Sequence, residues 1–508
     1  MVGSLLQRRG TDADAGVEAA QDTLRDLNID QVVHAVTAGR ESFQLDTWFR
    51  RPLTDVEDVR FRQAVFHDLR REDVRSVMDS FAAGLDQVRA LLATAAKVHY
   101  SLVRQRLVLE ASLQYFSVLH AVLDGLREAR PRSRALAALE SDLAQLATSD
   151  PFREREQRSS ELVRDLSAVR YNILIRGAKV SVGPYDDEPD YGEQILDLFD
   201  RFRQRDAPQT PRPPKKALDM NHVEAAVLDR VARLEPEVFS RLAQFAQAQP
   251  DVIDQVVARY GKELQFYLAW LGFVAPLEAA GLRTCLPAVS SSDPAEEAHD
   301  TFDIALATRL RPEGLPVVND YVIDGPERVL VVSGPNQGGK TTFARTFGQL
   351  HHFAALGCPV AGRSARLLLP DRVLTHFERA ESADGRSGKL EEELLRLRAV
   401  LDGATGRTVL VLNELFSSTT VADASSLSRR VLHRVFELDA LCVYVTFLDE
   451  LSTLSERTVS MVAGVQPDDP AVRTFAIERR PADGKAYAWA IARKYRLTYD
   501  ELLQRIPS

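Results

Sequence analysis

Residues 331–347, VVSGPNQGGKTTFARTF, decide the fold of the C-terminal part of this chain. A β-branched run leads into a glycine-rich turn, which is followed by helix-forming residues. Residues 334–341 fit the pattern G-x-x-x-x-G-K-[ST] without a mismatch. In such a turn the backbone N–H groups point inward at phosphate oxygens, and the following helix adds the partial positive charge of its N-terminus. The sequence therefore predicts a phosphate-binding loop between a strand and a helix.

The residue types in this loop predict ATP and Mg²⁺ as the cofactors. The Lys340 ammonium would reach the β- and γ-phosphates, and the Thr341 hydroxyl would bind Mg²⁺. The expected nucleotide contacts come from Gly334, Pro335, Asn336, Gln337, Gly338, Gly339, Lys340, Thr341 and Thr342.

A second strand ends in the polar residues that hydrolysis requires. Residues 408–420, TVLVLNELFSSTT, place Asn413 and Glu414 directly after an apolar run. We expect Glu414 to orient and polarise the attacking water, which makes Glu414 and Lys340 the predicted catalytic residues. Asn413 stands where an aspartate normally holds a magnesium-bound water. Its neutral amide accepts the same hydrogen bond without charge assistance, so we expect weaker Mg²⁺ binding or slower turnover.

Composition places the chain among ordinary soluble globular proteins. Its 508 residues are 45% hydrophobic and 27% charged with a net charge of −9, so contact with nucleic acid would need a local basic patch. The three cysteines lie far apart, which indicates reduced thiols and neither a disulfide framework nor a zinc site. Residues 268–282 form the most apolar longer stretch, which is too short to span a bilayer. We therefore expect a cytoplasmic protein without a membrane partner.

The chain before about residue 300 is mainly helical by its apolar periodicity. Apolar residues recur three and four positions apart over residues 22–166 and again over residues 222–282. Between these regions, residues 170–184 alternate in polarity around a Gly-Ala turn and predict a small β-hairpin. Residues 201–216, RFRQRDAPQTPRPPKK, predict an exposed basic loop, which either clamps a phosphate backbone or is only a linker.

After residue 301 the pattern is that of an α/β domain. Residues 317–334 predict two strands paired as a hairpin around Asp324 and Gly325. Further β-branched runs follow, the first of them alternating with helical segments, which indicates a largely buried and mostly parallel sheet. These runs are residues 407–413, 440–447, 457–462 and 472–479.

The motifs around the phosphate loop resemble those of the MutS family of mismatch-repair ATPases. Residues 334–342, GPNQGGKTT, resemble its loop Gly-Pro-Asn-Met-Gly-Gly-Lys-Ser-Thr. Residues 413–427, NELFSSTTVADASSL, resemble its Asp-Glu-x-Gly-Arg-Gly-Thr-Ser-Thr-x-Asp-Gly-Leu-Ser, with Asp423 retained and both the first Asp and the Gly-Arg-Gly lost. Residues 445–451, VTFLDEL, resemble its Thr-His-Tyr-His-Glu-Leu switch without either histidine. The resemblance extends from about residue 28 to the C-terminus.

The resemblance implies an α-rich core and lever domain with a small clamp-like β insertion, followed by an α/β P-loop NTPase domain of the ABC type. The implied boundaries are an N-terminal arm over residues 1–27, the helical domain over 28–300 with its insertion near 170–216, and the ATPase domain over 301–508. Only about 27 residues precede the core-like segment, so we expect the family's mismatch-binding and connector domains to be missing. The terminal helical stretch, residues 485–506, is expected to support a homodimer.

Further residue roles also come from the resemblance alone. Ser387 would contact the γ-phosphate bound by a second subunit, because the family's sites are composite across a dimer; its alternative is a plain helix cap. Asn319 would lie near the base. With both switch histidines absent, Thr446 or Asp449 would sense the γ-phosphate.

These features predict an ATP-dependent, DNA-binding switch protein of the MutS type, in which slow ATP hydrolysis is coupled to dimer closure and DNA clamping in repair or recombination. Three alternatives stay open: the same ATPase acting on branched DNA or structured RNA, an ATPase acting on protein partners alone, and a nucleotide-binding structural protein with negligible turnover.

Three other groups of polar residues are interpreted as structural. Adjacent His351 and His352 on a helix point about a hundred degrees apart and cannot share one metal ion. Residues 391–393 form an acidic run, which we expect to be a solvated helix face. Four arginines, Arg60, Arg62, Arg70 and Arg71, are expected to make surface ion pairs.

Overall fold

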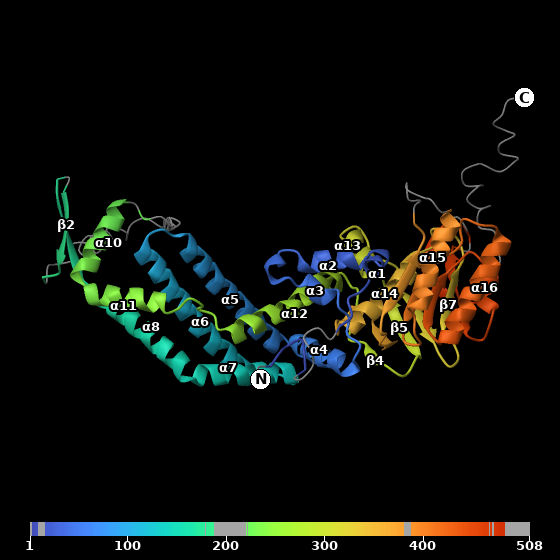
Figure 1. Ribbon diagram of the computed structural model, residues 1–508, viewed down its shortest axis with the longest axis horizontal. Coiled ribbons are helices and arrows are strands. Elements are labelled where there is room, and N and C mark those ends of the chain that lie inside the picture. Colours follow the sequence, from blue (N-terminus) through green and yellow to red (C-terminus); the bar gives the residue numbers. More distant parts are fainter. Residues whose placement is uncertain are drawn as a thin grey trace, which may run out of the picture. The chain divides into compact units, whose positions relative to one another are not determined.

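The computed structural model describes residues 3–8, 16–177, 179–186, 220, 222–379, 388–466, 468–469 and 472–482. The chain divides into two compact units, whose elements are labelled in Figure 1. Unit 1 comprises Met1–Glu72, Pro131–Leu139 and Lys262–Ser508, and unit 2 comprises Asp73–Arg130 and Glu140–Gly261. Each unit is therefore assembled from segments that are distant in sequence. Within the described ranges, no helix has the length and apolar character needed to cross a membrane.

Unit 1 is built around a six-stranded sheet with the strand order β10-β11-β12-β7-β13-β14. The first five strands in this order run parallel, and β14 pairs antiparallel with β13 at one edge. The strands are β7 (Val329–Ser333), β10 (Val373–Phe377), β11 (Val409–Asn413), β12 (Leu441–Val445), β13 (Thr458–Val465) and β14 (Arg473–Arg479). The mostly parallel sheet and the four strands predicted after residue 407 are confirmed.

Helices cover both faces of this sheet, which explains why β7, β11 and β12 are buried along their whole length. α14 (Lys340–Ala355) packs against β11 and β12. α15 (Lys389–Asp402) and α16 (Val421–Leu438) contribute Leu397, Leu432 and Val435 to a core that includes side chains of β7, β11 and β12. Figure 1 shows α15 and α16 beside the strands in orange, at the C-terminal end of the colour scale.

A smaller four-stranded sheet in unit 1 has the order β4-β9-β5-β6, and β3 pairs with β8. The predicted hairpin over residues 317–334 is wrong, because β6 pairs antiparallel with β5 whereas β7 lies between β12 and β13. Both edges of β7 are taken by parallel neighbours, so no edge is left for β6. These strands are β3 (Thr284–Cys285), β4 (Ala288–Ser290), β5 (Glu296–Thr301), β6 (Asn319–Ile323), β8 (Val360–Ala361) and β9 (Ser364–Leu368).

The N-terminal residues are held inside unit 1 by apolar burial and hydrogen bonds. The Leu5 side chain is fully buried, and its backbone N–H donates to Glu263 Oε2 at 2.6 Å. Arg62, also buried, donates from Nε to Leu6 O at 3.0 Å and from Nη1 to Leu356 O at 3.2 Å. Arg62 therefore makes no surface ion pair, contrary to expectation, whereas Arg60 pairs with Glu57 at 2.7 Å.

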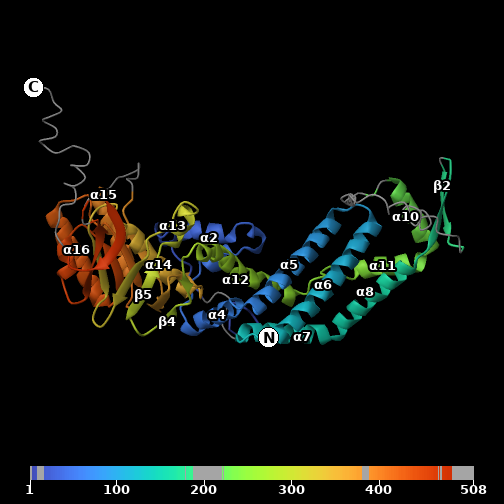
Figure 2. The same cartoon turned by 180° about the vertical axis from the view of Figure 1, so that it is seen from behind.

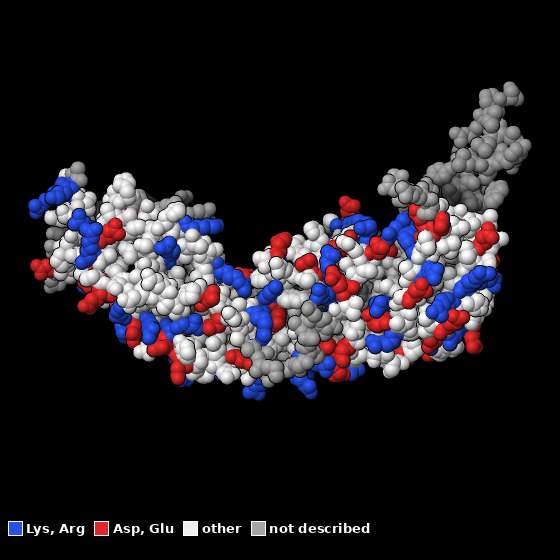
Figure 3. Space-filling model, viewed as in Figure 1, with Lys and Arg blue, Asp and Glu red and all other residues white. Residues whose placement is uncertain are grey.

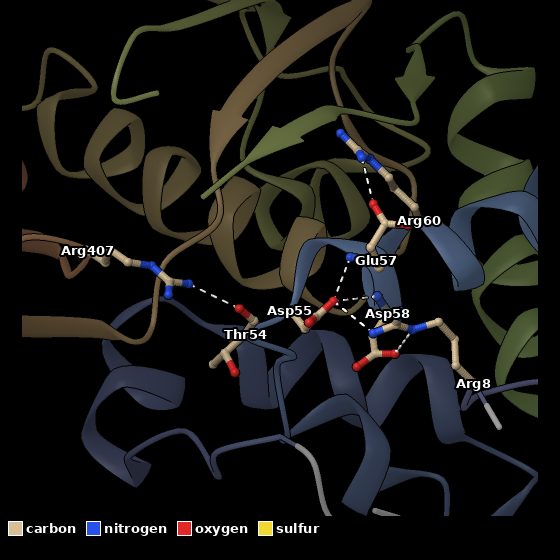
Figure 4. Close-up of polar contacts among 7 residues, drawn as sticks. All are labelled: Arg8, Thr54, Asp55, Glu57, Asp58, Arg60 and Arg407. Carbon is tan, nitrogen blue, oxygen red and sulfur yellow. Dashed lines mark hydrogen bonds and ion pairs between the residues drawn. The ribbon is translucent and has the colours of Figure 1, made fainter. Parts of the chain in front are cut away.

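Figure 4 shows how polar contacts fix α4 (Val56–Leu69) at its N-terminus. Asp55 caps the helix and also accepts from Arg8 Nη2 at 3.1 Å, while Asp58 accepts from Arg8 Nε at 2.5 Å. Arg407 donates from Nη2 to the carbonyl oxygen of Thr54 at 3.1 Å. The segment that leads into β11 is thus joined to the helical part of unit 1. The other helices that lie wholly in unit 1 are α1 (Gln21–Asp26), α2 (Ile29–Thr37), α3 (Asp46–Phe49) and α13 (Ile304–Leu310).

Unit 2 is a helical assembly that carries the predicted β-hairpin. Leu109, Leu162 and Leu242 form a buried core between α6, α8 and α11. The hairpin consists of β1 (Tyr171–Arg176) and β2 (Lys179–Pro184), and Figure 2 shows β2 beside α10. The helices that lie wholly in unit 2 are α6 (Ser101–Ala129), α8 (Asp150–Ala168), α10 (His222–Leu234) and α11 (Pro236–Gln247). The residues of α5 (Glu72–Lys97), α7 (Arg134–Thr148) and α12 (Gln255–Ala279) are divided between the two units.

Candidate nucleotide-binding site

The loop over residues 334–339 joins the buried strand β7 to α14, as the sequence predicts. Gly334 has φ +107° and Gly339, the N-cap of α14, has φ +94°, in the left-handed region that favours glycine. A Cβ on Gly334 would also lie 3.1 Å from the backbone nitrogen and oxygen of Ala463 on β13. Two of the glycines in the pattern are therefore required by the backbone path of the loop.

Lys340 lies inside this loop. Its side chain is buried, and Nζ donates to Gly334 O at 2.8 Å, Asn336 Oδ1 at 3.2 Å and Pro335 O at 3.4 Å. Burial lowers the pKa of Lys340, opposed by the nearby carboxylate of Glu414. All three acceptors within the described structure are neutral oxygens. A buried ammonium with neutral partners suits an anionic ligand such as a phosphate group, so the residues present fit the predicted nucleotide.

Asn413 and Glu414 reach the same edge of the sheet as the phosphate loop. Asn413 is in register with Val445 on β12, which is itself in register with Val332 on β7. The Glu414 backbone N–H donates to Val445 O at 2.9 Å, and Glu414 has φ +55°. Carboxyl ends of parallel strands meet at one edge of a sheet, which is where open α/β sheets bind ligands.

The side chain of Asn413 has a free acceptor. Its Oδ1 is buried and, among the described residues, has no hydrogen-bond partner. Buried polar atoms in folded proteins are nearly always hydrogen-bonded, to protein or to ordered water. This amide oxygen therefore fits the predicted contact to a magnesium-bound water.

The comparisons with known proteins agree with this geometry. Residues 330–494 match the family model of MutS domain V. Over 190 residues, the chain is 32% identical to "Endonuclease MutS2" of Thermus thermophilus, covering 37% of this chain and 25% of that protein. The chain is therefore similar to MutS proteins, and residues 330–494 correspond to their domain V.

Two further relatives show how far the similarity to MutS proteins extends. "DNA mismatch repair protein MutS" of Brevibacillus brevis is 30% identical over 151 residues, which cover 29% of this chain and 17% of that protein. "DNA mismatch repair protein MutS 2" of Haloarcula marismortui is 22% identical over 472 residues, covering 81% of this chain and 48% of that protein. The chain thus spans less than half the length of the curated MutS relatives that it matches.

The segment that resembles the MutS switch lies directly after β12. Thr446 is buried, and its Oγ1 accepts from the Leu448 N–H at 3.0 Å, whereas Phe447 is exposed. Asp449 begins a 3₁₀ helix, η3 (Asp449–Thr453), and its carboxylate opposes the lowering of the Lys340 pKa. Of the two predicted γ-phosphate sensors, Asp449 is therefore the one whose charge acts at the loop.

Asn319 lies beside the loop but is engaged with β14. Its Oδ1 accepts from the Ile477 N–H at 2.6 Å, and its Nδ2 donates to Phe475 O at 3.3 Å. Asn319 therefore fixes β14 beside the loop. A Cβ added to Gly339 would lie 3.6 Å from Cδ1 of Phe475 on this strand. Arg473 donates from Nε to Asn336 O at 3.2 Å. These β14 contacts could not be predicted from the sequence, because a strand pattern alone does not show that β13 pairs with β14.

The acidic run on α15 is only partly a solvated face. Glu391 is exposed, but Glu393 is buried and accepts from the Phe416 N–H at 2.7 Å. The prediction is wrong for Glu393, and the signal that could have identified it is its position on the same helix face as buried Leu397.

The two histidines on α14 have separate structural partners. His351 Nε2 lies 2.7 Å from Glu296 Oε1, and His352 Nε2 lies 2.9 Å from Phe49 O. The prediction that they do not share a metal ion agrees with this arrangement. Within the described ranges, no group of three or more His, Cys, Asp or Glu side chains could hold a metal ion.

Three predictions concern parts of the chain outside the described residues. Ser387, the basic loop at residues 201–216 and the terminal helical stretch at 485–506 all fall there, and their roles stay predictions.

Proposed function

We propose that this protein is a slow ATPase of the MutS type that acts as a DNA-binding switch. The observation that carries the proposal is the buried Lys340 ammonium, surrounded by neutral loop oxygens, at the sheet edge where Glu414 directly follows β11. A cationic loop and a carboxylate at one edge are the minimum that binding and hydrolysis of a nucleoside triphosphate require.

Different residues of the site would bind different parts of the nucleotide and its metal ion. Backbone N–H groups at the start of α14, together with Lys340, would hold the phosphate oxygens, with Thr341 and Asn413 (through water) on the metal ion. Mg²⁺, when bound, neutralises charge on the transferred phosphoryl group. Glu414 would accept a proton from the attacking water and orient it toward the γ-phosphorus. Because Asn413 has no charge, we expect hydrolysis to be slow.

ATP binding would be coupled to dimer closure and to DNA. The proposed homodimer has composite sites, in which Ser387 of one subunit contacts the γ-phosphate held by the other. Binding energy for that phosphate favours the closed state, and hydrolysis restores the open one. The similar proteins are named as an endonuclease and as mismatch repair proteins, which supports a role in DNA repair or recombination.

The hairpin of unit 2 supports DNA as the partner. Arg176 and Lys179, both exposed, face each other across its turn, and Figure 3 shows basic side chains over the end that carries β1 and β2. Over much of the remaining surface visible in Figure 3, acidic and basic side chains are interspersed. A local basic site on a chain of net charge −9 is the pattern that a restricted nucleic-acid contact requires.

The test is nucleotide-dependent self-association with a panel of nucleic acids. We expect the dimer to be favoured by ATP and Mg²⁺, and DNA binding to weaken steeply with salt. Preference for branched DNA or RNA over linear duplex, without a mismatch effect, would support the same ATPase with a different target. ATP hydrolysis indifferent to every nucleic acid would instead indicate that the ATPase acts on protein partners.

A further inference from the structure

The segment that follows Glu414 is held by a buried carboxylate on a different element. Glu393, on α15, accepts a hydrogen bond from the Phe416 backbone N–H at 2.7 Å and is 6% exposed. Phe416 has φ +61° and Glu414 has φ +55°, so two non-glycine residues within three positions adopt the left-handed region. Such residues are strained and persist only where the surrounding structure determines their conformation.

A second contact joins the same segment to the start of α15. Glu378, directly after β10, accepts from Ser417 Oγ at 2.8 Å and from Lys389 Nζ at 2.8 Å. Lys389 is the first residue of α15. The segment after Glu414 is therefore bound to this helix directly through Glu393 and indirectly through Glu378.

Glu414 itself lies between two anchors. On one side its backbone N–H is fixed to Val445 O of β12 at 2.9 Å. On the other side, two residues later, Glu393 fixes the Phe416 N–H. Because the peptide units between these anchors are planar and short, the direction of the Glu414 side chain depends on both.

The charge on Glu393 strengthens this hydrogen bond. Burial raises its pKa, but the neighbouring His376 and the Phe416 N–H lower it further than burial raises it, so the pKa is below the ordinary value. His376 Nε2 lies 3.8 Å from Glu393 Oε1. Glu393 is thus ionised at neutral pH, and a hydrogen bond from N–H to a carboxylate is stronger than one to a neutral acceptor.

We propose that Glu393 is a positioning residue for hydrolysis, which sets the direction of the Glu414 carboxylate from helix α15 through the backbone of Phe416. The inference rests on the proposed ATPase function. By this inference, α15 controls the hydrolysis rate although Glu393 does not contact the nucleotide. Misplacement of a catalytic group by about 1 Å can reduce a rate about 100-fold, so the hydrogen bond matters to turnover more than to ATP affinity.

The test compares kcat and KM for ATP in Glu393→Ala, Glu393→Gln and wild type. We expect Glu393→Ala to lower kcat by about 10- to 100-fold while KM changes less than about twofold. The glutamine amide oxygen can still accept from the Phe416 N–H, so Glu393→Gln should restore most of kcat. Glu391→Ala, on the exposed side of the same helix, is the matched control and should match wild type.

Ser417→Ala provides a variant that leaves no buried charge or cavity. It removes only the contact to Glu378 and should lower kcat severalfold at unchanged KM, even if Glu393→Ala fails to fold. Values of kcat within twofold of wild type in Ser417→Ala and in every folded Glu393 variant would overturn the inference and leave the proposed ATPase intact. Wild-type protein without hydrolysis would instead overturn the proposed function itself.

Discussion

Lys340 Nζ lies 2.8 Å from the carbonyl oxygen of Gly334, so the first residue of α14 is hydrogen-bonded to the first residue of the phosphate loop. The ammonium is buried and its acceptors are neutral, which leaves its charge available to a phosphate group. A hydrogen bond from this buried ammonium to a phosphate oxygen would be strong. A bound phosphate group would therefore also stabilise the loop.

Glu414→Gln should remove hydrolysis and keep ATP binding. The amide cannot accept a proton from water, and general-base catalysis typically contributes about 10²- to 10⁴-fold. Single-turnover hydrolysis and equilibrium binding of ATP measured on the same preparation separate the two effects. Equal loss of affinity and rate would mean that Glu414 acts in binding.

Asn413→Asp should increase the affinity for Mg²⁺. The buried Oδ1 atom has no hydrogen-bond partner in the described structure, and a carboxylate there would bond a metal-held water with charge assistance. We expect half-saturation of ATPase activity at about tenfold less Mg²⁺, and Asn413→Ala should shift it in the opposite direction. A titration unchanged in both variants would exclude residue 413 from the metal site.

Gly334→Ala should weaken ATP binding by at least about tenfold. Alanine at φ +107° is strained by about 1–3 kcal/mol, and its Cβ would approach the backbone of Ala463. Gly272→Ala is the control, because a Cβ in the middle of α12 meets no atom within 4 Å. We expect this control to bind ATP normally and to be slightly more stable. Equal ATP affinity in both variants would show that the loop tolerates a side chain at 334.

Stability should fall in acid because of His352. Burial lowers its pKa from 6.5 to about 4, so the unfolded state binds a proton that the folded state does not between these values. Stability from this residue is complete above pH 6.5 and decreases as the pH falls toward 4, by about 3 kcal/mol in total. Urea unfolding of wild type and His352→Gln at several pH values measures this. If the free energy of unfolding had the same pH dependence in the two proteins, His352 would not be the source of the loss of stability in acid.

The sequence predicted the parts of the site that lie in one continuous stretch. The phosphate loop, its flanking strand and helix, and the strand ending at Asn413 depend on local patterns of apolar residues and glycines. The failed hairpin at residues 317–334 shows the limit, because the turn signal at Asp324 and Gly325 is local whereas strand pairing is decided by distant neighbours. Glu393 was misjudged for the same reason: its partner Phe416 is 23 residues away.

The central claim is that the loop with Lys340 binds a triphosphate, and equilibrium binding of ATP tests it most directly. Wild-type protein and Lys340→Ala are titrated with ATP, with and without Mg²⁺. We predict magnesium-dependent binding by wild type and a loss of about 10- to 100-fold in the variant, as expected for removal of an ionic hydrogen bond. Equal affinity in the two proteins, or no magnesium-dependent binding by wild type, would contradict the account.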